Sequence, residues 1–125
     1  MAELGEKRLF LLDMDGTIYL DETLFPGTIP FLQGVRARGG RYLFLTNNSS
    51  KSVDAYVEKL ARLGIEAAQE DFLTSVDALI HDLAQRPAYR KCYAFGTRTF
   101  RRQLVQGGVK VTDRLEEDVD CLLVG

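Results

Sequence analysis

The stretch LLDMDGT (residues 11–17) places two carboxylates, Asp13 and Asp15, directly after an apolar run. That run, residues 9–12, is short and continuous, which is typical of a strand buried on both faces of a parallel sheet. In open parallel sheets, ligands bind at the carboxyl ends of the strands, so a site is expected here. A solvated loop with a turn at Asp15-Gly16 explains the pair alone equally well.

The rest of the chain alternates strand-like and helix-like segments. Strands are predicted at 42–45, 72–74, 91–95, 109–111 and 119–124. Helical patterns follow Thr28, residues 46–50, Ser75 and Thr97, with Thr28 and Ser75 as expected caps, and they stop near glycines or at the break 85–88. This order predicts the α/β class: a Rossmann-like parallel sheet with helices on both faces.

Composition excludes several classes of protein. The 125 residues are 46% hydrophobic and carry a net charge of −2, which gives no basic footprint for nucleic acid. The apolar run near the N-terminus is too short for a signal peptide or a membrane span. Cys92 and Cys121 are expected to be free thiols, although a disulfide is left open. We expect a soluble, cytoplasmic protein without nucleic-acid or membrane partners.

The paired carboxylates suggest a specific chemistry. Two carboxylates this close repel each other unless a cation lies between them or one holds a proton. Mg²⁺ suits carboxylate, carbonyl and phosphate oxygens. Gly16 relaxes the backbone of the loop, and Thr17 offers a hydroxyl. Such a set suits phosphoryl transfer, in which one carboxylate attacks phosphorus and its neighbour moves a proton.

The segment DMDGT resembles the first motif, DxDGT, of the haloacid dehalogenase (HAD) superfamily. Residues 17–65, with TNN at 46–48 and LxxLGI at the following helix end, resemble the NagD-type and 4-nitrophenylphosphatase-like subgroup. LTSVDAL and CLLVG extend the likeness over essentially the whole chain. The resemblance implies that residues 1–85 form the N-terminal portion of a HAD-like core. Residues 86–125 would begin a C2-type cap domain that is truncated.

The resemblance also implies roles at the site. Asp13 would be the nucleophile that forms an aspartyl-phosphate, and Asp15 the general acid and base. Mg²⁺ would bind the Asp13 carboxylate and the Asp15 backbone carbonyl. The substrate would be a small phosphorylated metabolite, a phosphate monoester that is hydrolysed. The residues expected to bind phosphate or substrate are Thr46, Asn47, Gly16 and Thr17.

Parts of the family's site are not assigned in this chain. The family's third motif supplies a lysine and its fourth an acidic pair, and we expect both to lie beyond Gly125. The chain alone is therefore expected to be inactive or weak, with an apolar edge exposed beside its first strand. One alternative is a catalytically incomplete piece that binds or oligomerises, including as a homo-oligomer. Another is a HAD phosphotransferase or mutase.

Three other features have simpler readings. Gly96-Thr97-Arg98 is better explained as a helix cap than as a phosphate cradle. The acidic residues at 116–118, together with Asp120, favour a solvated turn over a metal site. His81, the only histidine, is expected at the surface.

Overall fold

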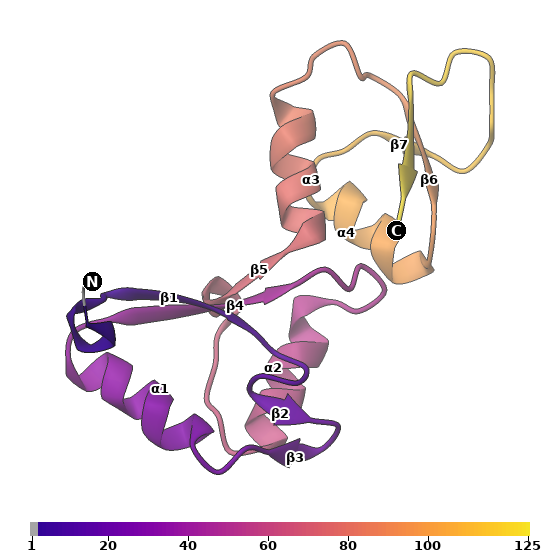
Figure 1. Cartoon of the computed structure of the whole chain (residues 1–125). Coiled ribbons are helices and arrows are strands. Elements are labelled where there is room, and N and C mark those ends of the chain that lie inside the picture. Colours follow the sequence, from indigo (N-terminus) through magenta and orange to yellow (C-terminus); the bar gives the residue numbers. More distant parts are fainter. Residues whose placement is uncertain (1–2) are drawn as a thin grey trace. The chain divides into compact units, whose positions relative to one another are not determined.

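The computed structural model describes residues 3–125, which form two compact units. Among the described residues, the first unit contains those up to Thr46 together with 56–73, and the second contains residues 47–55 and 74–125. Both are α/β units with parallel strands, as the sequence predicts (Figure 1). The predicted domain boundary at 85/86 does not coincide with this division into units, and it stays a prediction.

The first unit is built on a three-stranded sheet in the order β1-β4-β5. Its strands are β1 (Leu9–Asp13), β4 (Arg41–Thr46) and β5 (Phe72–Thr74), and β1 and β4 run parallel. Helix α1 (Thr28–Ala37) connects β1 to β4, and α2 (Val53–Arg62) connects β4 to β5. A short 3₁₀ turn (Leu4–Glu6) precedes β1, and another (Gln69–Asp71) precedes β5.

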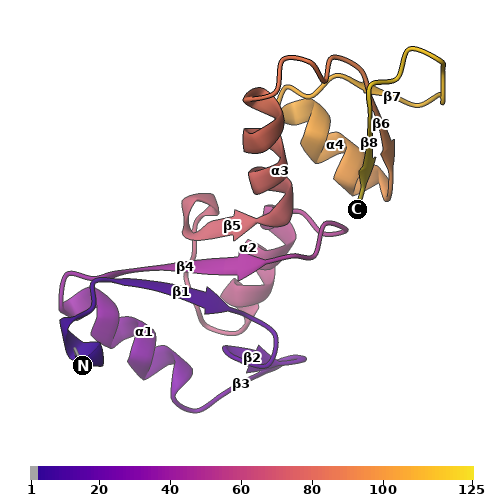
Figure 2. The same cartoon turned by 45° about the horizontal axis from the view of Figure 1, so that its top comes forward.

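One face of this sheet holds the core of the first unit. Phe10 is paired with Tyr42, and Phe44 lies two residues further along β4, so all three project from the same face. Phe31 of α1 meets the Phe10 ring edge-on at 5.4 Å. Tyr56 of α2 lies 6.2 Å from the ring of Phe72, which in turn lies 5.4 Å from Phe44. Both helices therefore cover the same face of the sheet, an arrangement that Figure 2 also shows.

The opposite face of the first sheet is an uncovered patch of leucines. Leu9 and Leu11 of β1 are each 56% exposed, and Leu73 of β5 is 44% exposed. Leu43 and Leu45 of β4 are half-buried beside them. The expectation that β1 is buried on both faces is therefore wrong for Leu9 and Leu11, because both helices of the unit lie on the other side. We call these five side chains the leucine face.

The second unit repeats this one-sided design. Its sheet has the order β7-β6-β8, with β6 (Cys92–Phe95), β7 (Val111–Thr112) and β8 (Cys121–Val124) all parallel. Helices α3 (Ser75–Ala84) and α4 (Arg98–Gln106) supply Val76, Phe100 and Leu104 to one core. Cys92 and Cys121 are register partners and are free thiols, as expected.

Several local predictions needed correction. The segment 19–24 forms a small antiparallel hairpin, β2 (Tyr19–Leu20) and β3 (Thr23–Leu24), where a loop was expected. Thr28 does not cap α1: it is the first helical residue, and its hydroxyl donates to the Ile18 carbonyl at 2.7 Å. Thr74 rather than Ser75 caps α3, because its hydroxyl accepts from Asp77 N at 3.0 Å. The helix ends are as expected, since Gly39, Gly64 and Gly108 adopt positive φ angles.

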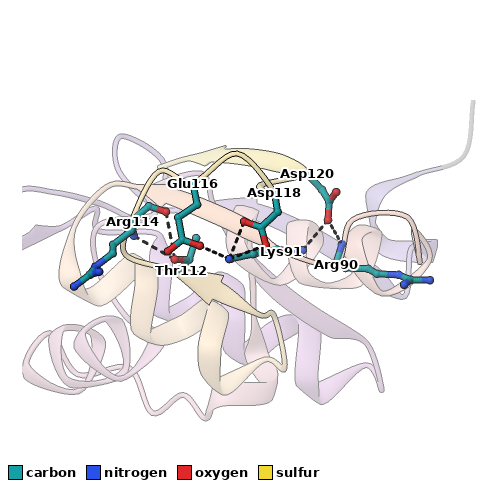
Figure 3. Close-up of polar contacts among 7 residues, drawn as sticks. All are labelled: Arg90, Lys91, Thr112, Arg114, Glu116, Asp118 and Asp120. Atoms are coloured by element: carbon teal, nitrogen blue, oxygen red, sulfur yellow. Dashed lines mark hydrogen bonds and ion pairs between the residues drawn. The ribbon is translucent and has the colours of Figure 1, made fainter.

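The acidic turn before β8 is organised by a lysine (Figure 3). Lys91 Nζ donates to Glu116 at 2.5 Å and to both carboxylate oxygens of Asp118 at 2.9 and 3.0 Å. The Asp120 carboxylate accepts from the backbone N–H groups of Arg90 and Lys91 at 3.0 Å. Within residues 3–125 there is no cluster of three or more His, Cys, Asp and Glu residues that could hold a metal ion. These hydrogen bonds and ion pairs hold the acidic turn against the start of β6.

The two simpler readings at Thr97 and His81 are confirmed. The Thr97 side chain accepts from Phe100 N at 3.1 Å and so caps α4, and His81 is exposed. Across the described range 3–125, none of the helices is both long and apolar enough to cross a bilayer.

Phe44 should contribute far more to stability than Leu11. Phe44 is fully buried, so Phe44→Ala removes a large side chain from the core and should cost about 3–5 kcal/mol. Leu11 is 56% exposed, so Leu11→Ala should cost only about 1 kcal/mol. Urea denaturation of both variants tests this, and similar losses would show that the leucine face is buried in solution.

The contacts between Lys91 and the acidic turn should weaken in acid. The hydrogen bond from Lys91 holds the pKa of Asp118 below its ordinary value of 3.8. A depressed carboxylate pKa stabilises the folded loop above 3.8, and this contribution is lost as the pH falls through the lower folded-state pKa. Amide hydrogen exchange in residues 113–120 should therefore accelerate on acidification, relative to the intrinsic exchange rate. Lys91→Met should accelerate it already at neutral pH, while Lys110→Met serves as the matched control.

Candidate active site

The candidate site lies at one edge of the first sheet because β1 and β4 are parallel. In their register Asp13 is paired with Leu45, so Thr46 is one residue beyond the level of Asp13. Both strands therefore deliver a polar side chain to the same carboxyl edge. This is the edge at which open α/β sheets bind ligands.

Asp13 ends β1, and its side chain is held by the residue that follows it. Its Oδ1 accepts a hydrogen bond from Met14 N at 2.8 Å. Met14 is 2% exposed, so its side chain anchors the backbone between the two aspartates. Asp13 itself is exposed and lies on the same side of the sheet as the leucine face, because it alternates with Leu9 and Leu11.

The loop after Asp13 is a tight turn around the Met14 carbonyl. That oxygen accepts from Thr17 N at 3.0 Å and Ile18 N at 2.8 Å, while Gly16 N donates to the Tyr19 carbonyl at 2.8 Å. Gly16 has a φ of 81°, and a Cβ there would meet nothing within 4 Å. Glycine is therefore required by the backbone angle rather than by space.

This turn leaves three of the predicted site residues accessible. Asp15, Gly16 and Thr17 are exposed, whereas Ile18 and Tyr19 are each 3% exposed and anchor the loop. The Thr28 hydroxyl also clamps the loop to α1 through the Ile18 carbonyl. This hydrogen-bonded loop can present the Asp15 carboxylate and the Thr17 hydroxyl to one small ligand.

Thr46 has a neighbour that sequence reasoning did not assign to the site. Thr46 Oγ1 lies 3.4 Å from the hydroxyl oxygen of Tyr56 on α2. Tyr56 is 6% exposed and matches the apolar spacing of its helix, so the sequence signal was that of a core residue. Only the pairing of α2 with the end of β4 reveals that its hydroxyl reaches Thr46.

Tyr19 is a second buried phenol that the sequence did not connect with the site. Burial is the main cause that raises its pKa, followed by Tyr56, Asp15 and Asp13 in that order. Lys59 of α2 places its ammonium 4.1 Å from the centre of the Tyr19 ring. Tyr19 therefore remains a neutral hydrogen-bond donor at physiological pH.

Asn47 belongs to the second unit, and its role in shaping the pocket stays a prediction. Its backbone carbonyl accepts from the Ser75 hydroxyl at 3.3 Å. Next to it, Asn48 Oδ1 accepts from the backbone and hydroxyl of Ser50 at 3.0 and 2.6 Å, which forms a turn before α2. The polar segment is thus locally ordered on its own.

The residues at this edge fit a hard divalent cation. Within residues 3–125, neither Asp13 nor Asp15 forms an ion pair with a lysine, arginine or histidine side chain. Two exposed carboxylates in one short turn repel each other, which a bound cation would relieve. Mg²⁺ is typically held by one or two carboxylates together with waters and substrate phosphate.

The chain is similar in sequence to known phosphatases. The chain is 40% identical over 115 residues to the glycerol-3-phosphate phosphatase of Rattus norvegicus, which covers 85% of this chain and 36% of that protein. It is 29% identical over 116 residues to an acid sugar phosphatase of Staphylococcus haemolyticus, covering 93% and 43%.

Solved structures show the same fold. A 4-nitrophenylphosphatase of Thermotoga maritima superposes with a TM-score of 0.85 at 31% identity, covering 97% of this chain and 45% of that one. A glycerol phosphate phosphatase of Mycobacterium tuberculosis, in complex with magnesium, gives 0.85 at 30% identity, covering 100% and 38%.

This chain therefore spans less than half the length of the relatives that it matches. Residues 10–110 match the family described as haloacid dehalogenase-like hydrolase. With the NagD-type phosphatases among its structural neighbours, the expected resemblance is confirmed. The chain belongs to the haloacid dehalogenase-like hydrolases.

Proposed function

We propose that this chain carries the nucleophilic half of a magnesium-dependent phosphatase for small phosphate monoesters, acting in the cytoplasm. The observation that carries the proposal is the pair of accessible carboxylates in a hydrogen-bonded turn, at the same carboxyl edge of the parallel sheet as Thr46. The phosphatases among its relatives support the same chemistry. The free thiols Cys92 and Cys121 favour a reducing compartment.

In the proposed reaction, a carboxylate oxygen of Asp13 attacks phosphorus as the bond to the leaving oxygen breaks. Asp15 gives its proton to that oxygen, so the alcohol leaves and an aspartyl-phosphate remains. Asp15 then takes a proton from water, which attacks phosphorus and releases phosphate while the Asp13 carboxylate is regenerated. Bound Mg²⁺, held by the Asp13 carboxylate and the Asp15 carbonyl, would neutralise phosphoryl charge.

The other site residues would hold the phosphoryl group. Thr46 would donate a hydrogen bond to it from the neighbouring strand end. Gly16 and Thr17 lie in the exposed turn, where the Thr17 hydroxyl can reach an anion. Asn47 would complete the pocket. The lysine and acidic pair of the family are not assigned in these 125 residues, so low activity is expected of the chain alone.

Replacing the two aspartates should separate their roles. Asp13→Asn should lower turnover at least about a hundredfold with every substrate, because it removes the nucleophile. Asp15→Asn should cost about 10²–10⁴-fold with glycerol phosphate, whose alkoxide needs a proton to leave. It should cost less with 4-nitrophenyl phosphate, whose leaving anion is stable.

The assay measures phosphate release with Mg²⁺ from the chain itself. A second form joins residues 1–125 to the part of the rat glycerol-3-phosphate phosphatase that follows the matched segment. Asp21→Asn is the matched control, because Asp21 is an exposed aspartate in the β2–β3 turn whose φ of 52° asparagine tolerates. Full activity in Asp13→Asn would contradict the proposal. Transfer of phosphate to an acceptor without its release would favour a phosphotransferase or mutase.

A second candidate function is self-association through the leucine face, without catalysis. The exposed Leu9, Leu11 and Leu73 form an apolar surface on one side of the sheet. On the same face Arg41 lies at the start of β4 and Asp13 at the end of β1. Two copies stacked about a two-fold axis, with strands antiparallel, would place Arg41 of each opposite Asp13 of the other. This charge complementarity favours a second copy as the occupant.

Light scattering after size exclusion, over a range of chain concentrations, tests the pairing. The wild-type chain should form dimers that dissociate on dilution, and Leu11→Lys should remain monomeric because it places a charge in an apolar interface. Leu115→Lys is the control, since Leu115 is 72% exposed in a loop of the second unit. A wild-type chain that is monomeric at all concentrations would rule out this function.

A further inference from the structure

The contact between Thr46 and Tyr56 has a consequence for how a phosphoryl group is bound. Thr46 Oγ1 and Tyr56 Oη lie 3.4 Å apart, and either atom can donate. Tyr56 is 6% exposed, with its ring packed against Phe72, so packing fixes where its hydroxyl lies. Thr46 is half-buried at the strand end, and its hydroxyl therefore meets a pre-positioned partner.

The direction of this hydrogen bond follows from proton counting. A threonine hydroxyl has one proton and two lone pairs. Phosphoryl oxygens only accept, so a Thr46 that binds them must use its single proton for that purpose. Its oxygen is then left to accept from Tyr56, which must be the donor. The required order is Tyr56 O–H to Thr46 Oγ, and Thr46 O–H to the phosphoryl oxygen.

We propose that Tyr56 is a positioning residue of this site, which directs the Thr46 proton towards the bound phosphoryl group. The inference rests on the proposed phosphoryl-binding role of Thr46. Tyr56 acts only through Thr46, by selecting the rotamer that keeps the hydroxyl, rather than the methyl group, beside it. Because threonine has few χ1 states, one hydrogen bond of this kind is enough to favour one of them.

The surroundings of Tyr56 agree with this role. Tyr19, whose pKa is raised by burial and then by Tyr56, Asp15 and Asp13, lies within electrostatic range of both the phenol and the carboxylates. Tyr56 therefore belongs to the same local environment as the candidate nucleophile.

The first test follows the Thr46 side chain in the 125-residue chain without substrate. Three-bond couplings to a ¹³C-labelled threonine methyl report its χ1 state. The wild type should show one dominant rotamer, and Tyr56→Phe should show averaging among rotamers. Tyr42→Phe is the matched control, because Tyr42 is 4% exposed and contacts Arg36 and Phe44 instead. An unchanged Thr46 rotamer in Tyr56→Phe would overturn the inference.

The second test measures affinity for orthovanadate, a phosphate analogue, in the presence of Mg²⁺. Tyr56→Phe should weaken binding about three- to tenfold, the range expected for one neutral hydrogen bond. In a Thr46→Val background, where no hydroxyl remains to be oriented, Tyr56→Phe should have no further effect. Equal effects in both backgrounds would show that Tyr56 acts through the fold alone and would overturn the inference.

The two tests also separate this inference from the proposed function. If Thr46→Val leaves vanadate affinity unchanged, or if vanadate does not bind, the proposed role of Thr46 fails. The rotamer measurement still decides whether Tyr56 orients Thr46. Melting temperatures of the wild type, Tyr56→Phe, Thr46→Val and the double variant identify any chain whose affinity changes only because it is partly unfolded.

Discussion

The parallel pairing of β1 with β4 is the constraint on which the site depends. Its register sets Asp13 beside Leu45 and brings Thr46 to the same edge of the sheet. A shift of one residue would exchange the two faces of a strand, so Asp13 would turn towards the buried aromatic side chains. The register is in turn fixed by that aromatic face, where Phe10, Tyr42 and Phe44 pack beneath the helices. The same register is therefore needed both to pack the aromatic core and to place the Asp13 carboxylate.

Both sheets are covered by helices on a single face, so each has a second face that carries exposed apolar side chains. In the first unit β1, β4 and β5 follow one another across the sheet, and the connecting helices α1 and α2 pack on the same side of it. The other side keeps the leucine face. In the second unit Phe95, Leu122 and Val124 are similarly exposed opposite the helices. Parallel sheets are normally covered on both faces, so these surfaces are suited to burial against further protein.

Much of the fold could be predicted because its signals are local. Continuous apolar runs marked β1 and β4, and glycines with positive φ angles marked the helix ends. The small hairpin was missed because two-residue strands are too short to show a period. Thr28 looked like a helix cap, but its hydroxyl is used by the Ile18 carbonyl, ten residues earlier. The exposure of Leu9 and Leu11 was missed for a different reason. An apolar run indicates that a strand is suited to burial, but it does not indicate whether another element covers each of its faces.

The residues of the candidate site also differ in whether the sequence alone could identify them. Asp13 and Asp15 were found because they are adjacent in sequence, whereas Tyr56 and Tyr19 reach the site only through packing of α2 and the turn. The apolar spacing correctly predicted that the ring of Tyr56 is buried in the core. It did not predict which atom its hydroxyl contacts. Sequence patterns describe which face a residue occupies, while the function of a phenol depends on what its single polar atom meets.

Asp13 links the two candidate functions, because it is the proposed nucleophile and also lies on the same side of the sheet as the leucine face. Any apolar partner that covers this face also removes water from Asp13, and a nearby positive charge would then replace the stabilisation that water gives to its carboxylate. In a phosphatase that charge would come from Mg²⁺, together with the lysine that the family's third motif supplies. In a two-fold pair of this chain it would come from the Arg41 side chains. The cation that compensates Asp13 therefore decides which function is available, and the two functions exclude each other at that residue.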